Sequence, residues 1–502
     1  MNVLKSKFWC VLSGILIFAG MMAFFAAHPL YIYDSDDWHY ISFSRHALPS
    51  VRQWNPTKIL PETLLPLCAE IAVRFVMPFT KDYIGSMGMV FAVVVSLGIA
   101  GYIMSFGKHL ETEYGIKGIQ SVLVMMLILL LHFLPFNTHI SGNAHLFWAD
   151  NVNCVFNYTI PGLLNGILFL VLFSADPEIQ KRGKRYTASG ILLLLIYLAV
   201  NSNMFQSIMI SSLAGVKLLL SLFADRGRSE KRLSKRYLKE YIHKNSLWLS
   251  VLVLWILSLG FEVQGGRASK AVSGISNLPV KETLKRFTGR MGSMNKLFAV
   301  IIGITVFSGL ALCLYRRIRN IWDHRDSKFL RSIETEFLCL CITVVYLILL
   351  CSKVYPYYIE RSYVLFAMIF YLIVMAASSL VYMVSKIPVC TVIMPLICYF
   401  LLFETVIDGK SFAEYNVLQY PGKQIKLLDE YYIEQILAAD EAGFTEAEVH
   451  VAKHFSDTWP LGISEGGVKM AVSLYRHGLT DKMISAFFVA DDMVNQMYHL
   501  PD

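Results

Sequence analysis

Long runs of apolar residues, separated by short polar connections, fill most of the chain. The first run, residues 8–30, contains no formally charged residue and is long enough for a helix to cross a hydrocarbon core of roughly 30 Å. Because each of the later runs is also helix-sized, the pattern predicts an all-α, multi-pass membrane protein with about eleven transmembrane helices. The ten later runs are 83–106, 119–135, 159–174, 188–203, 204–223, 246–261, 297–315, 337–351, 362–385 and 388–406.

Composition agrees with this class. Of 502 residues, 55% are hydrophobic and only 16% are charged, and the mean hydropathy is +0.51; a soluble domain would carry about 25% charged residues. The net charge of +8 is not a signal for nucleic acid, because the basic residues fall in the connections between apolar runs. The first run is too long for a signal-peptide core, so we expect it to be retained. The lipid bilayer is therefore the predicted partner.

Loop charge predicts the topology. The segment 60–79 is also apolar but carries Glu62, Glu70 and Arg74, so it either crosses the membrane or lies in the interface. If it does not cross, 23 of the 45 Lys and Arg residues fall on one side, as expected for cytoplasmic loops. These residues lie in 1–7, 107–117, 175–187, 224–244 and 316–336 and at Lys386. We therefore expect a cell-membrane protein with a cytoplasmic N-terminus and an extracytoplasmic C-terminus.

Two domains are predicted. Residues 1–406 form the transmembrane domain, and 407–502 form a tail with 15 acidic and 7 basic residues. The tail combines helix-like stretches at 425–439 and 467–476 with an alternating run at 446–451. This pattern predicts a small soluble α+β domain on the outer side of the membrane.

An acidic motif follows the first apolar run, at the start of the predicted outer loop 31–82. Asp34, Asp36 and Asp37 stand within four residues, and carboxylates so close together usually need a metal, a cation or a shared proton. Asp34 or Ser35 could instead cap a helix that starts near Asp37. Capping accounts for one or two of the aspartates but not for the whole set, so we interpret the motif as functional.

The architecture resembles that of the GT-C superfamily of integral-membrane glycosyltransferases. A first helix is followed by an outer loop that opens with an acidic pair and continues into helices on the membrane surface. The match covers residues 1–406, and the run Ser35-Asp36-Asp37-Trp38-His39-Tyr40 is similar to the opening of bacterial GT-C-like families. The resemblance implies that Asp36 or Asp37 is the catalytic base or a metal ligand, with Asp34 as an additional acid. The pair could thus hold Mg²⁺ or Mn²⁺ through oxygen ligands.

Uncharged polar and aromatic residues gather in the outer loop 136–158, which contains no Lys or Arg. Amide, imidazole and aromatic groups suit a sugar, whose hydroxyls need hydrogen-bonding partners and whose C–H face stacks on a ring. The alternative is an ordinary polar loop rich in turn-forming residues. We predict five residues for binding the sugar or the acceptor: His39, Tyr40, Trp148, Asp150 and Asn151.

Basic residues on the outer side predict a phosphate site. The outer loop 262–296 holds seven Lys and Arg residues against two Glu, which suits either contact with anionic headgroups or a clamp for a lipid phosphate. Arg267 and Lys270 are the candidates there. Arg361 lies at the edge of an apolar run, where a charge needs a partner. Glu360 is one possible partner; the resemblance favours a substrate phosphate instead.

The cytoplasmic loops indicate which kind of donor the protein uses. None of them forms a Gly-rich phosphate cradle or is long enough for a nucleotide-binding domain, so a nucleotide sugar has no predicted site. We therefore expect transfer of a sugar from a polyprenyl-phosphate carrier to a cell-envelope glycan, polymer or lipid acceptor, on the outer face and with inversion. A transporter or flippase of a lipid-linked sugar, or a glycan ligase, are the alternatives.

Overall fold

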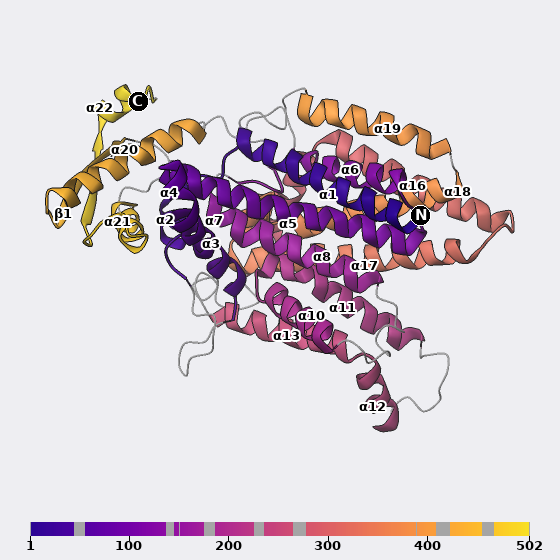
Figure 1. Ribbon diagram of the computed structural model, residues 1–502. Coiled ribbons are helices and arrows are strands. Elements are labelled where there is room, and N and C mark those ends of the chain that lie inside the picture. Colours follow the sequence, from indigo (N-terminus) through magenta and orange to yellow (C-terminus); the bar gives the residue numbers. More distant parts are fainter. Residues whose placement is uncertain are drawn as a thin grey trace.

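The computed structural model describes most of the chain. The described residues are 2–44, 56–136, 145–149, 151–174, 186–224, 235–264, 278–387, 389–407, 422–453 and 466–500. They are mostly helical, and the long helices pack side by side in a bundle (Figure 1). Asp150, Arg267 and Lys270, which the sequence singles out, lie outside the described residues.

Seven helices in this part of the chain are long and apolar enough to cross a membrane, which confirms the multi-pass prediction. A bent pair, α12 (Lys235–Lys244) with α13 (Ser246–Gln264), makes an eighth candidate. The number eleven remains a prediction, although three shorter apolar helices coincide with the other predicted runs: α6 (Ile119–Phe133), α10 (Tyr186–Val200) and α19 (Val389–Leu402), the last followed by η6 (Phe403–Ile407). The seven are α1 (Asn2–Ala27), α5 (Tyr83–Tyr114), α7 (Val152–Cys154) with η2 (Val155–Thr159) and α8 (Ile160–Ser174), α11 (Met204–Ala224), α16 (Lys296–Ile318), α17 (His324–Val354) and α18 (Phe366–Lys386).

One predicted connection is much shorter in the structure. The sequence assigns 316–336 to a loop, whereas α16 continues to Ile318 and α17 begins at His324. The charged stretch after His324 is helical because Asp323 caps it and because several of its side chains, including Phe329 and Glu336, are buried against neighbouring helices. Hydropathy alone therefore placed the start of this helix too late.

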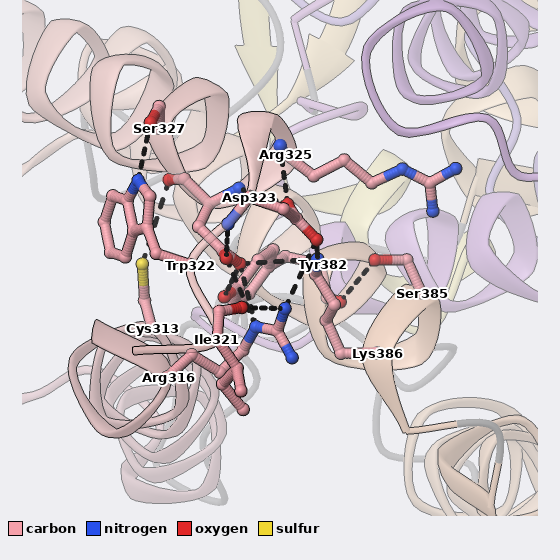
Figure 2. Close-up of polar contacts among 11 residues, drawn as sticks. Cys313, Arg316, Ile321, Trp322, Asp323, Arg325, Ser327, Tyr382, Ser385 and Lys386 are labelled. Carbon is pink, nitrogen blue, oxygen red and sulfur yellow. Dashed lines mark hydrogen bonds and ion pairs between the residues drawn. The ribbon is translucent and has the colours of Figure 1, made fainter. Parts of the chain in front are cut away.

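A charged network fastens the α16–α17 turn to the end of α18 (Figure 2). Asp326 is completely buried and accepts hydrogen bonds from Arg316 Nε at 3.1 Å and from Tyr382 Oη at 2.7 Å. Lys386 Nζ lies 3.4 Å from the same carboxylate. Asp323 accepts from the N–H groups of Arg325 and Asp326 and also pairs with Arg316. Since each buried charge has a partner, the network can hold three helix ends together without an isolated buried charge.

The acidic motif lies at the other end of the bundle from the N-terminus of α1. There α2 (Ser35–Tyr40) is followed by a continuous helical segment made of α3 (Ile59–Ile71), η1 (Ala72–Val76) and α4 (Met77–Thr80). Lys58 N–H, before this segment, donates to Asn201 O in the α10–α11 turn. Asp82, after it, caps α5. Because both ends of the segment contact this end of the bundle (Figure 1), the segment does not cross the bundle.

The tail is a small α+β unit, as predicted. It consists of α20 (Gly422–Glu441), β1 (Glu446–Ala452), α21 (Gly466–Arg476), β2 (Ser485–Asp491) and α22 (Asp492–Met497). The two strands are parallel, with Glu446 opposite Ser485 and Ala452 opposite Asp491. The predicted helices and first strand fall in α20, α21 and β1, while β2 was missed. The tail packs on the motif end of the bundle, where Tyr83 Oη lies 2.7 Å from His477 Nδ1.

Candidate functional site

Asp34 starts helix α2 by capping it. Its carboxylate accepts hydrogen bonds from the backbone N–H groups of Asp36 at 2.8 Å and of Asp37 at 3.0 Å. Asp37 in turn accepts from the N–H of Asp34 at 3.4 Å, which completes a capping box. This arrangement satisfies backbone donors that a helix start otherwise leaves without partners. The capping alternative therefore describes Asp34.

The buried side chain of Asp37 holds two segments of the protein together. Its side chain is completely buried, and its carboxylate also accepts from the N–H groups of Tyr33 at 2.8 Å, Asn153 at 2.7 Å and Val152 at 3.2 Å. These donors come from both sides of α2, so one carboxylate joins the end of the α1–α2 connection to α7. A carboxylate surrounded by backbone donors is well suited to positioning and has no face open to a substrate.

The pKa shifts of Asp34 and Asp37 also favour a positioning role for these two residues. Burial raises the pKa of Asp37 well above that of a free aspartate, and the nearby charge of Asp34 adds to the effect, while the backbone N–H donors oppose it. Burial also raises the pKa of Asp34, to about 6, against the hydrogen bond from the Asp37 N–H. Two carboxyl groups this close titrate as a unit. Neither one is an accessible, fully ionised base.

Asp36 differs from its two neighbours because its carboxylate is open. Its side chain is 51% exposed, and one oxygen lies 3.8 Å from Lys469 Nζ, which belongs to α21 of the tail. Lys469 also lies 3.5 Å from Ser35 Oγ. Since Asp34 and Asp37 fix the helix that carries it, Asp36 is an accessible carboxylate on a rigid support.

Helix α21 packs next to the Asp36 carboxylate through contacts with Ser42. Ser473 is buried and its hydroxyl lies 2.9 Å from Ser42 Oγ, just after α2. Arg476 Nη1 donates to Ser42 O at 3.0 Å. Sequence reasoning missed Lys469 because no motif or spacing connects it with residues 434 positions earlier. The amphipathic pattern of 467–476 predicted a helix but not the surface on which it docks.

His39 and Tyr40, predicted to bind sugar, are half-buried and follow Asp36 on α2. The His39 ring stacks on Phe43, with ring centroids 4.9 Å apart, and meets Tyr40 edge-on at the same distance. Burial lowers the pKa of His39, and the charge of Lys469 lowers it further, although Asp36 works in the opposite direction. The net lowering favours the neutral form of the ring. The structure thus places an imidazole and a phenol on α2, three and four residues after the open carboxylate.

Asn151 and Trp148 make structural contacts. The Asn151 amide donates to the Asp34 carboxylate, and its oxygen accepts from the N–H of Cys154 at 2.9 Å, so that Asn151 caps α7. Trp148 Nε1 donates to His28 O at 3.1 Å. The loop is close to the acidic motif, as expected for a shared site, but these two polar groups are used to join it to the α1–α2 connection.

Arg361 lies between η5 (Pro356–Glu360) and α18. Its guanidinium is 4.5 Å from the centre of the Tyr358 ring and 5.9 Å from that of Tyr363. No described carboxylate pairs with it, since Glu360 pairs with Arg286 at 2.7 Å. Glu360, the partner that the sequence suggests for Arg361, is therefore already paired with Arg286.

Arg361 is also connected to the elements that hold the acidic motif. The Tyr363 ring packs on Tyr158 of η2 at 4.5 Å, and its hydroxyl lies 3.8 Å from Cys154 Sγ at the end of α7. The structure therefore brings the predicted phosphate-binding arginine and the acidic motif to the same end of the bundle, around α7 and η2.

A metal held jointly by Asp36 and Asp37 does not fit these positions. The Asp37 oxygens face backbone N–H groups, which take up most of the four lone-pair sites of a carboxylate. Consecutive residues of a helix do not face the same side, and the Asp36 carboxylate points towards Lys469. Across the described ranges, no group of three or more His, Cys, Asp or Glu side chains could hold a metal ion.

Comparison with protein-family models, with curated proteins and with solved structures gives no significant match. The resemblance to the GT-C superfamily therefore remains an expectation from the sequence.

Proposed function

We propose that the protein transfers a sugar from a polyprenyl-phosphate carrier to a cell-envelope glycan, polymer or lipid acceptor, with Asp36 as the general base. One observation supports this assignment more than the others. Asp36 is the aspartate of the motif with an open carboxylate, and it is held on a helix that its two neighbours fasten to the bundle. A general base needs such access together with a fixed position.

In this mechanism, Asp36 takes the proton from the acceptor hydroxyl as its oxygen attacks the anomeric carbon. The bond between that carbon and the phosphate oxygen breaks, and polyprenyl phosphate leaves with the electron pair. Attack from the opposite side inverts the anomeric configuration. Arg361 would stabilise the departing phosphate, since a guanidinium can hold two phosphate oxygens at once. Lys469 would hold the Asp36 carboxylate in position.

Lys469→Met should reduce the rate of transfer and lower kcat more than it changes KM. The reason is that the variant removes the ammonium group that lies 3.8 Å from the Asp36 carboxylate and helps to hold it in position. Lys469→Arg should restore most of the activity. Steady-state kinetics checks this, with Lys482→Met, at an exposed position of the tail, as the matched control. Equal kcat values in Lys469→Met and Lys482→Met would contradict the positioning role of Lys469.

Arg361→Ala should raise the KM for the lipid-linked donor much more than it changes kcat. Arg361→Lys should recover only part of the loss, because an ammonium group cannot reproduce the two-pronged contact of a guanidinium. Steady-state kinetics with a polyprenyl-phosphate sugar gives both constants. Arg319→Ala, at an exposed residue of the α16–α17 turn, is a suitable control. If the two alanine variants have the same KM, Arg361 does not bind the donor.

The proposal requires the motif end of the bundle to lie outside the cell. Single cysteines at Lys239 and Glu448, both exposed, should be labelled by a membrane-impermeant maleimide from opposite sides, in a variant without the native cysteines. The residue in β1 should react in intact cells and the residue in α12 only after permeabilisation. Labelling of both positions in intact cells would contradict the topology.

The direct test is transfer by the purified protein in liposomes. Polyprenyl phosphates with different labelled sugars are offered with a hydroxyl acceptor, and the release of polyprenyl phosphate is measured. The proposal predicts release that depends on Asp36. Absence of release from every donor, with folded protein, would contradict it.

One observation favours transport as a second candidate. Glu336 is completely buried within α17, where Ser378 Oγ donates to one carboxylate oxygen at 2.8 Å. Its other oxygen has no hydrogen-bond partner among the described residues. An acid inside a membrane-spanning helix is often part of a proton or ion pathway. Flipping of a fluorescent lipid-linked sugar in liposomes that is lost in Glu336→Gln and retained in Asp36→Asn would favour a transporter.

A further inference from the structure

A second charged site lies on helix α15 (Val280–Gly292), outside the acidic motif. The helix and the neighbouring η5 border a cavity of about 690 Å³. The cavity is lined by the basic residues Lys285, Arg286 and Arg290, by Ser293, and by the acidic residues Glu282 and Glu360.

Helix α15 is fixed to the bundle and supports this cavity. Thr283 is buried and accepts a hydrogen bond from Ser352 of α17 at 2.8 Å. Just beyond α15, the N–H of Asn295 donates to Pro135 O, after α6, at 2.9 Å. Helix α15 is thus held near both of its ends, and the basic side chains project from a rigid element.

The two acids of the cavity are already paired. Arg286 contacts Glu282 at 3.0 Å and Glu360 at 2.7 Å. In the part of the chain that the structure describes, neither Lys285 nor Arg290 has a carboxylate partner. With three basic and two acidic side chains, the cavity carries one surplus positive charge, and both Lys285 and Arg290 are left without a direct carboxylate contact in the described residues.

The side chain of Arg290 has a buried hydrogen-bond donor that lacks an acceptor. Its guanidinium lies 4.3 Å from the centre of the Phe136 ring, and its Nε is buried without a hydrogen-bond acceptor in the described residues. Arginine stays protonated in proteins, so this donor cannot be removed by titration. A buried donor without an acceptor costs about 1–3 kcal/mol, and more on a charged group. Because Arg290 borders the cavity, an anion that drew this guanidinium towards it would supply the missing acceptor.

We propose that the cavity binds the phosphate monoester of a lipid. A guanidinium presents two parallel N–H donors that match two phosphate oxygens, and Lys285 would add a point charge. The surroundings suit a lipid: Tyr355, just before η5, and Tyr357, within it, are exposed, and exposed tyrosines at the end of a membrane helix favour the interface. The inference rests on the proposed function only for the identity of the lipid, since polyprenyl phosphate, which the proposed transfer releases, is such a monoester.

Binding of farnesyl phosphate, a short polyprenyl phosphate, tests the site in the purified full-length protein. We expect the Kd of farnesyl phosphate to rise at least about tenfold in Arg290→Gln, which corresponds to about 1.4 kcal/mol. Lys285→Gln should weaken binding less, because Lys285 is exposed. Lys281→Gln is the matched control, since Lys281 is an exposed residue of the same helix that does not line the cavity.

Two further probes separate the sources of the phosphate. Farnesol has the same chain without the charge, and inorganic phosphate has the charge without the chain. Binding of farnesyl phosphate alone supports a lipid ligand, whereas Arg290-dependent binding of inorganic phosphate as well shows that the phosphate group suffices. Equal affinities for farnesol and farnesyl phosphate, or equal Kd values in Arg290→Gln and Lys281→Gln, would overturn the proposal.

The binding measurement is independent of transfer. If Arg290→Gln does not fold, Lys285→Gln still tests the site, because a change at an exposed side chain spares the fold. If farnesyl phosphate binds as expected but no donor supports transfer, the transferase proposal fails and the phosphate site remains. If transfer depends on Asp36 but farnesyl phosphate binding ignores Arg290 and Lys285, the phosphate site fails alone.

Discussion

Asp36→Asn is expected to lower the rate of sugar transfer at least about 10²-fold and to leave the protein folded. The amide has nearly the same size but cannot accept a proton from the acceptor hydroxyl. Asp36 makes no capping contact through its side chain, and its carboxylate is half exposed, so the fold does not depend on its charge. Initial rates with purified protein and a polyprenyl-phosphate sugar measure the effect, and thermal unfolding checks the fold.

Asp34→Asn is the matched control for this experiment. Asparagine is as good an N-cap as aspartate, so α2 should still form and the activity should remain within about tenfold of wild type, well short of the 10²-fold effect of general-base loss. Full activity in Asp36→Asn would remove the general-base role, and with it the main support for a glycosyltransferase.

The sequence predicts the membrane helices well because the bilayer leaves few alternatives. A chain in hydrocarbon must satisfy its backbone groups within a helix, so apolar runs translate directly into helices such as α5 and α18. Helical segments with many charged residues lack this hydropathy signal. The first turns of α17 are charged and were predicted as a loop, since their helical state depends on the Asp323 cap and on burial of Asp326 and Glu336 in the assembled bundle.

The acidic motif could be located from the sequence, but the roles of its members could not be separated. Both a helix start and a general base favour aspartate, and only the position of each carboxylate distinguishes the two. In the structure, Asp34 and Asp37 face backbone N–H groups, while Asp36 faces Lys469. The same limit applies to Arg361, whose neighbour Glu360 pairs with Arg286 of a distant helix.

Contacts between distant segments are the part that a single sequence cannot provide. Lys469 reaches Asp36 only because α21 docks on α2 through Ser473 and Arg476. Strand β2 likewise forms because β1 offers it a parallel partner. The predicted roles of Asp150, Arg267 and Lys270 remain predictions, because these residues lie outside the described ranges.

Asp37→Asn is expected to loosen the junction between α2 and α7. An asparagine in this position keeps one acceptor oxygen but turns its NH₂ group towards backbone N–H donors that Asp37 now satisfies. Each buried N–H left without an acceptor costs about 1–3 kcal/mol. We therefore expect a lower unfolding temperature, and amide hydrogen exchange at Val152 and Asn153 that is faster by at least about tenfold, the equivalent of about 1.4 kcal/mol.

The comparison with Asp36→Asn separates anchoring from catalysis. Both variants are expected to transfer sugar poorly, but only Asp37→Asn should expose the amides of Val152 and Asn153, because the Asp36 carboxylate does not contact them. Hydrogen-exchange mass spectrometry of the peptide that contains α7 measures this difference. If Asp37→Asn loses transfer while these amides stay protected, Asp37 acts in the chemistry itself, and its buried carboxylate must become accessible when substrate binds.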